Sequence, residues 1–517
     1  MGILFNLLTL YIIFVNTNEA ARILVVVTTP AISHQSVFRP FTQELAKRGH
    51  DVTVITTDPV FPEGGAPPNL TEIDVHDVSY EAWLKPFRAK PPTNFAEQMK
   101  LFPEMLLNTI EAQLKDEKVA SLIADKNRLF DLLILEGYAR CLLLYSHIYK
   151  VPVIQMSSAG AFRDTFLQFG IPTHPFLYPQ IPSQRLNNLT IWEKVKQLYV
   201  IYFMHNFWED MMVKENKFLK ILFGPDSPSM TELINNVDML FLNVFPIFQG
   251  IRPVPPNVVF IGGLHQNQEK ELPADLKSYL DSSENGVMYL SFGSSMDPTL
   301  LPPERIQVLV KAASQLPYDV LWKWNGDELP GRTANIRISK WLPQSELLKH
   351  PNIKLFITQG GQQSTDEAIT AGVPMIGVPL LSDQFYNVER YEYLKIGIRM
   401  DLDTVTEDSF KAAVNKVIGD DSYRKNIVKL RGQLQDEVQS PLERAVWWTE
   451  YVLRHGGAKH LRSPAANISW AEYLELELVL TLLGGAFAVL SVLLLIVVKL
   501  YKLLFSRKEA LVKMKRN

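Results

Sequence analysis

Two regions of the chain share one pattern, in which short continuous apolar runs alternate with segments of helical period. In the first region the apolar runs cover residues 22–29, 51–57, 131–135, 151–156 and 237–243. In the second region they cover residues 287–292, 320–324 and 353–358. Apolar strands separated by helices indicate parallel βαβ units. The pattern therefore predicts an α/β protein with two domains, residues 21–245 and 286–456, joined by a proline-rich linker over 246–285.

The N-terminal end carries an apolar segment of a different kind. Residues 3–15 are apolar but too few to cross a bilayer comfortably, and the small residues Ala20 and Ala21 follow them. This arrangement predicts a signal peptide over residues 1–20. Because no Lys or Arg precedes the apolar core, a retained anchor is the competing interpretation.

The C-terminal end predicts a membrane span over residues 478–498, preceded by a juxtamembrane segment over 457–477. This uncharged run is followed by a basic tail, residues 499–517, so the positive-inside rule places the tail in the cytoplasm. The result is a single-pass type I topology with both domains in the lumen. Lys513 and Lys515 near the chain end resemble a dilysine signal for return to the endoplasmic reticulum, and a stop-transfer cluster is the alternative.

Composition excludes several classes of protein. A net charge of −3 gives no basic excess for nucleic acid, and a single cysteine, Cys141, excludes an intrachain disulfide and a cysteine-based metal cluster. The histidines show no paired metal-ligand spacing, so no metal site is expected. Asn69, Asn188 and Asn467 each open a sequon for N-glycosylation.

A glycine turn in the second domain is the clearest candidate for ligand binding. The apolar run over 353–358 ends at Gly360 and Gly361, and a helical pattern follows. Unpaired N–H groups at the start of such a helix attract a phosphate, and glycines let it come close. Ser294, in a second turn after the strand over 287–292, offers another phosphate contact. Polar residues flank the first turn on both sides, namely Trp341, Gln344, Asp383 and Gln384.

The first domain has candidate chemistry at its strand ends. His34 follows the strand over 22–29, in what the pattern predicts to be a loop, and Glu136 follows the strand over 131–135. Strand ends of a parallel sheet border the ligand crevice of such folds. A carboxylate there can hold one imidazole nitrogen and leave the other free to take a proton. On position alone, a structural role is at least as common for each residue.

The stretch over residues 341–384 closely resembles the donor-binding motif of the UDP-glycosyltransferase family. The resemblance rests on WLPQ, TQGGQQS, the EA pair, GVPM and the closing DQ. It implies that Trp341 stacks on uracil, that Gln344 contacts the base or ribose, and that Glu367 accepts the ribose hydroxyls. It further implies that Asp383 and Gln384 read the sugar hydroxyls. The remaining donor-binding positions that it implies are Ser294, Gln359, Gly360, Gly361 and Gln363.

The same resemblance assigns His34 as the catalytic base and Glu136 as its partner. Two departures from the family pattern stand out: Gln359 occupies a position where many members have His, and Glu136 one where Asp is usual. A glutamine amide can donate a hydrogen bond to a phosphate but cannot become cationic. We therefore expect donor binding to persist with weaker phosphate electrostatics.

The implied fold has two Rossmann-like domains facing across a cleft, of the GT-B type, plus a C-terminal transmembrane helix. The implied reaction is inverting transfer of a sugar from a UDP-sugar to a hydroxyl of small lipophilic acceptors, in detoxification or in hormone or pigment conjugation. No cofactor or metal is expected, and homo-oligomerisation is left open. The aspartates at 401 and 403 resemble a metal-binding DxD motif, but such pairs are frequent and the nucleotide site needs no metal.

Leu242 decides the expected donor sugar. In the family that the chain resembles, vertebrate glucuronate users carry an arginine in the region that matches Leu242. A neutral residue there favours UDP-glucose, with a glucuronosyltransferase as the alternative. A catalytically silent lipophile-binding protein of the same fold is the alternative from another class. The aromatic segment over 192–223 is read as core, with an acceptor-pocket wall or a membrane contact as the other interpretation.

Overall fold

The computed structural model describes residues 20–89, 95–179, 183, 185–186, 188–266, 270–294, 297–381 and 383–514. The predicted signal peptide, except its last residue, and the end of the dilysine tail lie outside these residues. The chain divides into a body, residues 1–462, and a C-terminal unit, residues 463–517.

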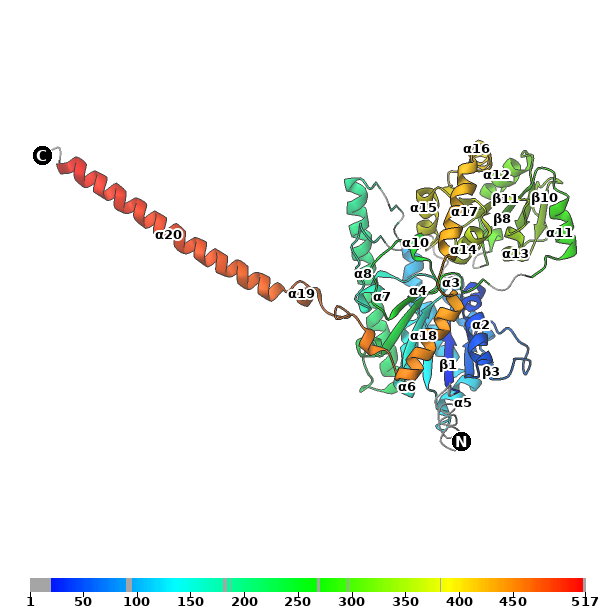
Figure 1. Ribbon diagram of the computed structural model, residues 1–517, viewed down its shortest axis with the longest axis horizontal. Coiled ribbons are helices and arrows are strands. Elements are labelled where there is room, and N and C mark those ends of the chain that lie inside the picture. The colour runs from blue at the N-terminus through cyan, green and yellow to red at the C-terminus, as the bar shows by residue number, and fades with distance from the viewer. Residues whose placement is uncertain are drawn as a thin grey trace, which may run out of the picture. The chain divides into compact units, whose positions relative to one another are not determined.

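The first half of the body is built on a seven-stranded parallel sheet of order β3-β2-β1-β4-β5-β6-β7 (Figure 1). Its strands are β1 (Arg22–Val27), β2 (Asp51–Thr56), β3 (Leu70–Asp74), β4 (Leu132–Glu136), β5 (Val153–Ser157), β6 (Val237–Leu242) and β7 (Val258–Phe260). Its helices are α2 (Ile32–Lys47), α3 (His76–Ala89), α4 (Phe95–Lys115), α5 (Glu117–Ala124), the 3-10 turn η1 (Arg140–Leu143), α6 (Leu144–Tyr149), α7 (Arg163–Gln168), α8 (Ile191–Phe223), α9 (Met230–Ile234) and α10 (Pro246–Gln249).

The second half carries a six-stranded parallel sheet of order β10-β9-β8-β11-β12-β13. Its strands are β8 (Val287–Ser291), β9 (Asp319–Lys323), β10 (Ile336–Ser339), β11 (Ile353–Thr358), β12 (Met375–Gly377) and β13 (Gly397–Arg399). Its helices are α11 (Ala274–Asp281), η2 (Pro298–Leu300), α12 (Pro303–Ser314), α13 (Gln344–Leu348), α14 (Gln362–Ala371), α15 (Gln384–Leu394), α16 (Glu407–Gly419) and α17 (Asp421–Gln435). The predicted class, two parallel-sheet α/β domains, is confirmed.

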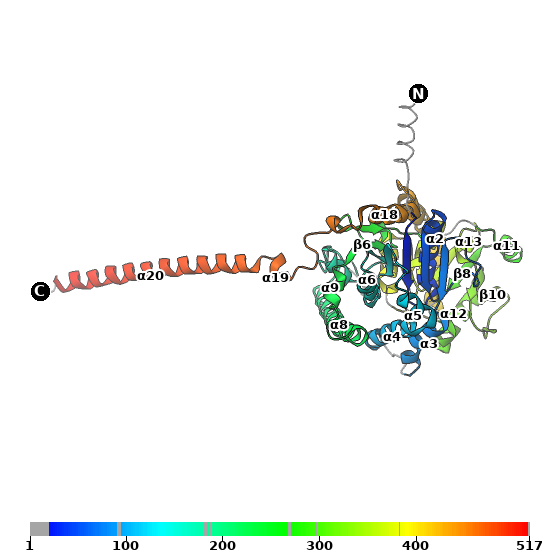
Figure 2. The same ribbon diagram turned by 90° about the horizontal axis from the view of Figure 1, so that it is seen from below.

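Two elements, β7 and α18 (Pro441–His455), lie outside the first domain by the sequence boundaries but pack on the first sheet. β7, inside the predicted linker, pairs with β6 and completes the first sheet. Helix α18, assigned to the second domain, packs instead on the first sheet, where Ala445, Val446 and Val452 join the core with β1. Figures 1 and 2 show α18 beside α2, which it contacts. The amphipathic pattern of α18 predicts a helix but does not indicate which sheet its apolar face covers.

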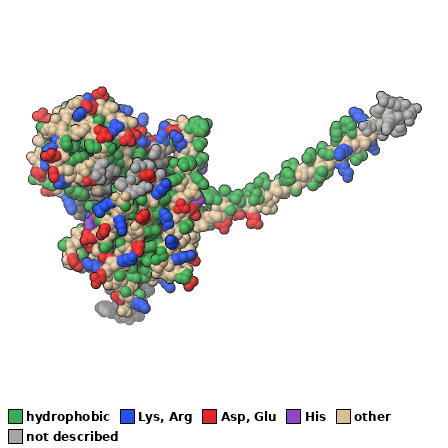
Figure 3. Space-filling view, turned by 180° about the vertical axis from the view of Figure 1, so that it is seen from behind, with side chains coloured by type: hydrophobic (Ala, Val, Ile, Leu, Met, Phe, Trp, Pro, Cys, Tyr) green, Lys and Arg blue, Asp and Glu red, His purple; other side chains and the backbone are tan. Residues whose placement is uncertain are grey.

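The C-terminal unit consists mainly of α19 (Trp470–Tyr473) and the long helix α20 (Leu476–Met514), and a 3-10 turn, η3 (Lys459–Leu461), ends the body before it. Residues 476–508 of α20 are long and apolar enough to cross a membrane. Figure 3 shows green apolar side chains along this helix, with Lys and Arg gathered toward its far end. The helix fits a single membrane anchor.

Candidate active site

His34 and Glu136 lie in direct contact at the ends of β1 and β4. His34 Nδ1 is 2.7 Å from Glu136 Oε1. The other carboxylate oxygen, Oε2, accepts the backbone N–H groups of Thr28 (3.0 Å) and Thr29 (2.8 Å). Glu136 is fully buried, whereas about a quarter (26%) of the His34 side chain is exposed. Three hydrogen bonds therefore fix the carboxylate, and the imidazole keeps one nitrogen, Nε2, for other partners.

His34 does not lie in a loop, contrary to the sequence prediction. It occupies the first turn of α2, which begins at Ile32, directly after the cap residue Ala31. The N-terminal turn lacks a side-chain cap and contains no acidic residue, so the sequence offers no signal for the helix start. Placement on a helix restricts the imidazole more than a loop would.

The two predicted phosphate turns lie against each other, with the Gln359 side chain between them. A Cβ on Gly293 would lie 2.3 Å from Gln359 Nε2, and one on Gly361 would lie 3.7 Å from it. Gly293 and Gly360 have φ values of +80° and +87°, which favour glycine. Gly361 is the N-cap of α14 and supplies no side-chain cap. Ser294, next to Gly293, is exposed. The arrangement offers helix N–H groups and an amide to an anion.

Gln359 is buried, and its Oε1 atom has no hydrogen-bond partner in the part of the chain that the structure describes. Such an atom costs free energy unless a ligand or water satisfies it. The buried unpaired amide oxygen therefore marks this position as one where a bound molecule can contribute a hydrogen bond.

Glu367, on α14, is held by a neighbouring amide. Gln344 Nε2 donates to Glu367 Oε2 (2.7 Å) and to Ser364 Oγ (2.9 Å), while Gln344 Oε1 accepts the Tyr289 hydroxyl (3.0 Å). Burial raises the pKa of Glu367 to about 7, and the Gln344 bond opposes that rise. Every polar atom of the Gln344 side chain is thus engaged, which makes Gln344 a residue that positions Glu367.

Asp383 and Gln384 begin α15 on the side of the second half that faces His34. Asp383 Oδ2 accepts from Asn387 Nδ2 (2.9 Å), and burial raises the pKa of Asp383 against the opposing effects of its hydrogen bonds and of nearby His34. Gln384 Oε1 accepts the N–H groups of Leu380 and Leu381, both at 2.8 Å. The Gln384 amide nitrogen is therefore the group left for a ligand.

Several hydrogen bonds join the two halves around this site. Gln363 Nε2 donates to the carbonyl of Ser158 (3.0 Å), and Gln249 Nε2 donates to Gln362 Oε1 (2.7 Å). Gln363, which the family resemblance places in the donor site, thus uses its amide to contact the first half. The first turn of α14 is held against the first half by these contacts.

Lys323, at the end of β9, was not predicted from the sequence as a site residue. Its Nζ donates to the carbonyl of Gly293 (2.6 Å) and lies 5.7 Å from the ring centre of Trp341, which is 62% exposed. Burial lowers the pKa of Lys323. A lysine ending an apolar strand beside the predicted phosphate turn is the signal that could have identified it.

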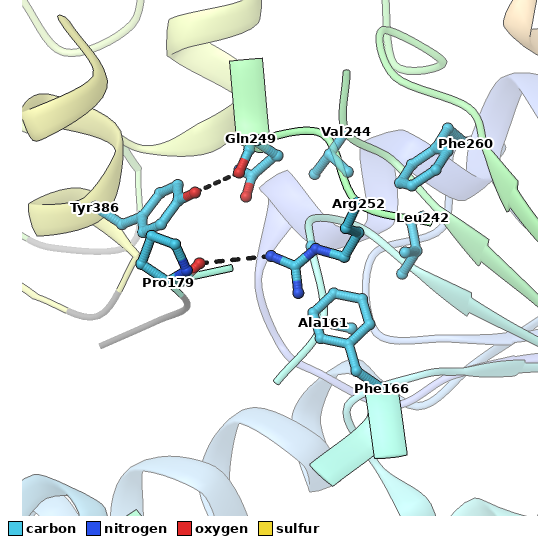
Figure 4. Close-up of a pocket in the computed structure, with 11 residues that line it drawn as sticks. Ala161, Phe166, Pro179, Leu242, Val244, Gln249, Arg252, Phe260 and Tyr386 are labelled. Carbon is cyan, nitrogen blue, oxygen red and sulfur yellow. Dashed lines mark hydrogen bonds between the residues drawn. The ribbon is translucent and has the colours of Figure 1, made fainter. Parts of the chain in front are cut away.

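A small cavity lies between the halves, with Leu242 in its lining. The cavity measures about 20 Å³, room for a water molecule but not for a sugar, and Leu242 and Arg252 line it (Figure 4). Arg252 Nη2 donates to the Pro179 carbonyl (3.4 Å) across the cavity. Leu242 itself is fully buried. Leu242 gives this cavity an apolar wall, and its part in the choice of donor sugar stays a prediction.

Two facing α/β halves with a His–carboxylate pair on one and a nucleotide-type turn on the other define a glycosyl-transfer fold. The solved structure of a UDP-glucosyltransferase from Polygonum tinctorium matches with a TM-score of 0.57 at 17% identity, covering 85% of this chain and 100% of that one. At this identity the match shows the fold alone. A glycotransferase of kitacinnamycin gives a TM-score of 0.56, covering 84% and 99%.

Sequence comparisons extend this result to the family. The family model described as UDP-glucoronosyl and UDP-glucosyl transferase matches residues 21–517. An ecdysteroid UDP-glucosyltransferase of Spodoptera littoralis nuclear polyhedrosis virus is 35% identical over 91% of this chain and 95% of its own. Human UDP-glucuronosyltransferase 2B7 is 30% identical over 88% and 89%. The chain belongs to the UDP-glycosyltransferase family and is an enzyme that transfers a sugar from a UDP-sugar to small acceptors.

Proposed function

We propose that this enzyme transfers glucose from UDP-glucose to a hydroxyl group of a small lipophilic acceptor, with inversion at the anomeric carbon. The observation that carries the proposal is the His34–Glu136 pair, which is fixed by the Thr28 and Thr29 backbone and lies near Asp383 of the other half. His34 Nε2 takes the acceptor proton while the acceptor oxygen forms a bond to C1 of the sugar and the bond from C1 to UDP breaks.

The second half holds the donor in this scheme. Trp341 stacks on the uracil ring, and Glu367, oriented by Gln344, accepts the two ribose hydroxyls. The diphosphate lies at the start of α14, near Gly361, Gln359 and Ser294, where helix N–H groups offset the charge that grows on the leaving group. Asp383 and the Gln384 amide bind the sugar hydroxyls. Lys323 adds a positive charge beside the same turn.

Glucose as the donor sugar is supported by the relatives. The ecdysteroid UDP-glucosyltransferases of three insect viruses are 34–36% identical, whereas the two mammalian glucuronosyltransferases are 30–32% identical. An ecdysteroid is a lipophilic polyhydroxylated steroid, so we propose acceptors of that class. Side-by-side turnover with UDP-glucose and UDP-glucuronate tests the donor, and a preference for UDP-glucuronate contradicts this part of the proposal.

The setting we propose is the lumen of the endoplasmic reticulum, with α20 as the membrane anchor and the basic tail in the cytoplasm. Asn69, Asn188 and Asn467, the three sequon residues, are exposed and have φ values of 64°, 52° and 61°, typical of turns. Turn positions are accessible to a glycan. Glycosidase treatment of the wild-type protein from microsomes should increase its gel mobility, whereas a variant with all three sequon residues changed from Asn to Gln should not respond. If the mobility of the wild type does not change either, the result argues against luminal domains.

Replacing the base tests the reaction itself. His34→Ala should abolish glucosyl transfer while UDP-glucose binding, measured by calorimetry, stays unchanged, because no donor contact is assigned to His34. Transfer at the wild-type rate by His34→Ala would refute the assignment of the base. Loss of both binding and transfer would instead indicate a folding defect, which a melting curve detects.

A further inference from the structure

A second cavity lies at the N-terminal ends of strands of the first sheet, whereas the His34–Glu136 pair lies at the C-terminal ends. It measures about 460 Å³, within the range of about 300–1,000 Å³ that holds small ligands. Its walls come from the start of β5 and β6, the end of α6 and the turn after α18, and the lining residues used below are Lys150, Asp238, His455, Lys459 and His460. The transfer reaction does not use any of them.

The cavity presents uncompensated positive charge. Lys150 and Lys459 are exposed, and neither ammonium group forms an ion pair or hydrogen bond with any residue that the structure describes. The acid in the wall, Asp238, has both oxygens engaged, since Oδ2 accepts the Val153 N–H (3.0 Å) and Oδ1 accepts the Ala458 N–H (2.8 Å). Two lysines and one carboxylate leave the cavity wall with a net positive charge, which attracts an anion.

An exposed aromatic surface on α18 leads to the same cavity. Trp447, 41% exposed, has its ring centre 5.6 Å from that of Tyr451, which lies 4.4 Å from His455. The Tyr451 hydroxyl also bonds His460 Nε2 at 2.8 Å. Trp and Tyr side chains gather at membrane–water interfaces because one end is apolar and the other is polar.

The cavity also lies where the chain leaves the body for its membrane span. Arg462, the last residue of the body, donates to the carbonyl and the Oδ1 atom of Asn235 (3.1 and 2.8 Å), next to the cavity residue Asn236. The segment 463–475 that follows reaches at most about 45 Å when extended before α20 begins. The cavity thus lies beside the last residue of the body, from which the segment to α20 continues.

We propose that this cavity binds the phosphate headgroup of an anionic phospholipid in the membrane that holds α20. Lys150 and Lys459 pair with the phosphate, and the α18 aromatic residues contact the interfacial layer beside it. The proposal does not depend on the sugar donor or on the acceptor.

The test uses full-length protein reconstituted in phosphatidylcholine bilayers that contain a minor fraction of phosphatidylinositol. The protein is re-extracted in non-ionic detergent, and the retained lipids are measured by mass spectrometry. The wild type should retain phosphatidylinositol above its bulk fraction, and the double variant Lys150→Glu, Lys459→Glu should lose about fivefold or more of this enrichment. The basic tail after α20 is common to all variants, so the difference reports the cavity.

The matched control, Lys416→Glu with Lys429→Glu, makes the same charge change at exposed positions of α16 and α17 and should retain the wild-type enrichment. A second pair, Lys150→Gln and Lys459→Gln, should show the loss without charge reversal, with an unchanged melting temperature confirming folding. Equal enrichment in wild type and both cavity variants overturns the proposal. A rise in melting temperature with inorganic phosphate, without phosphatidylinositol enrichment, identifies a soluble anion and overturns it as well.

Discussion

Replacing Glu136 by Gln gives the sharpest test of the His34–Glu136 pair. The charge-assisted bond of 2.7 Å is lost, which costs about 1.5–3 kcal/mol. If that energy is used only in the transition state, the turnover number falls roughly 10- to 150-fold. The glutamine oxygen still accepts the Thr28 and Thr29 N–H groups, so its NH2 faces His34 Nδ1. The imidazole must then carry its proton on Nε2, where it cannot act as a base.

This wrong tautomer adds a further loss, since the equivalent change in a catalytic triad costs about 10⁴-fold. The assay is initial rate with saturating UDP-glucose and a phenol acceptor, together with the KM for the donor, which should not change. Glu136→Asp restores a carboxylate and should recover most of the rate, whereas a purely structural role predicts no difference between Asp and Gln. Asp131→Asn is the matched control, because it neutralises the half-buried partner of Arg22 just before the same strand. A rate within tenfold of wild type for Glu136→Gln refutes the reasoning.

Three further predictions concern the second half and the cavity between the halves. Burial raises the pKa of Glu367 to about 7, so the carboxylate to which we assign the ribose hydroxyls forms as pH rises through 7. The donor KM should therefore fall about tenfold from pH 6 to 8. Glu367→Gln should remove this dependence, and an unchanged profile in the variant would contradict the prediction. Gly293→Ala places a methyl group against Gln359 at a φ of +80° and should raise the donor KM severalfold, whereas Gly419→Ala, with open space around it, should not. Leu242→Arg should lower the melting temperature, because a fully buried unpaired cation costs several kcal/mol; an unchanged melting temperature would contradict this expectation.

The sequence predicted the strands and the glycine turns because these features are local. Continuous apolar runs located β1, β4, β8 and β11, and the Gly360–Gly361 pair located the start of α14. The contact between His34 and Glu136 was also expected, since parallel strands end at one edge. Their roles in catalysis stay a prediction.

Contacts between distant segments could not be predicted in this way. Nothing local shows that Gln344 holds Glu367, that Gln363 bonds Ser158, or that Lys323 lies beside Gly293. Each polar side chain has several partners of suitable chemistry within reach, and tertiary packing decides among them.

The return of α18 to the first sheet has a consequence for biosynthesis. Its residues Ala445, Val446 and Val452 complete a core that otherwise contains strands made more than 180 residues earlier, such as β6. The second domain, lying entirely between β7 and α18, can fold as soon as it leaves the ribosome, whereas the first must wait for α18. The N-terminal domain is therefore the last to be completed. In a chain interrupted before residue 441, an apolar face of the first sheet stays exposed, and chaperones can bind it.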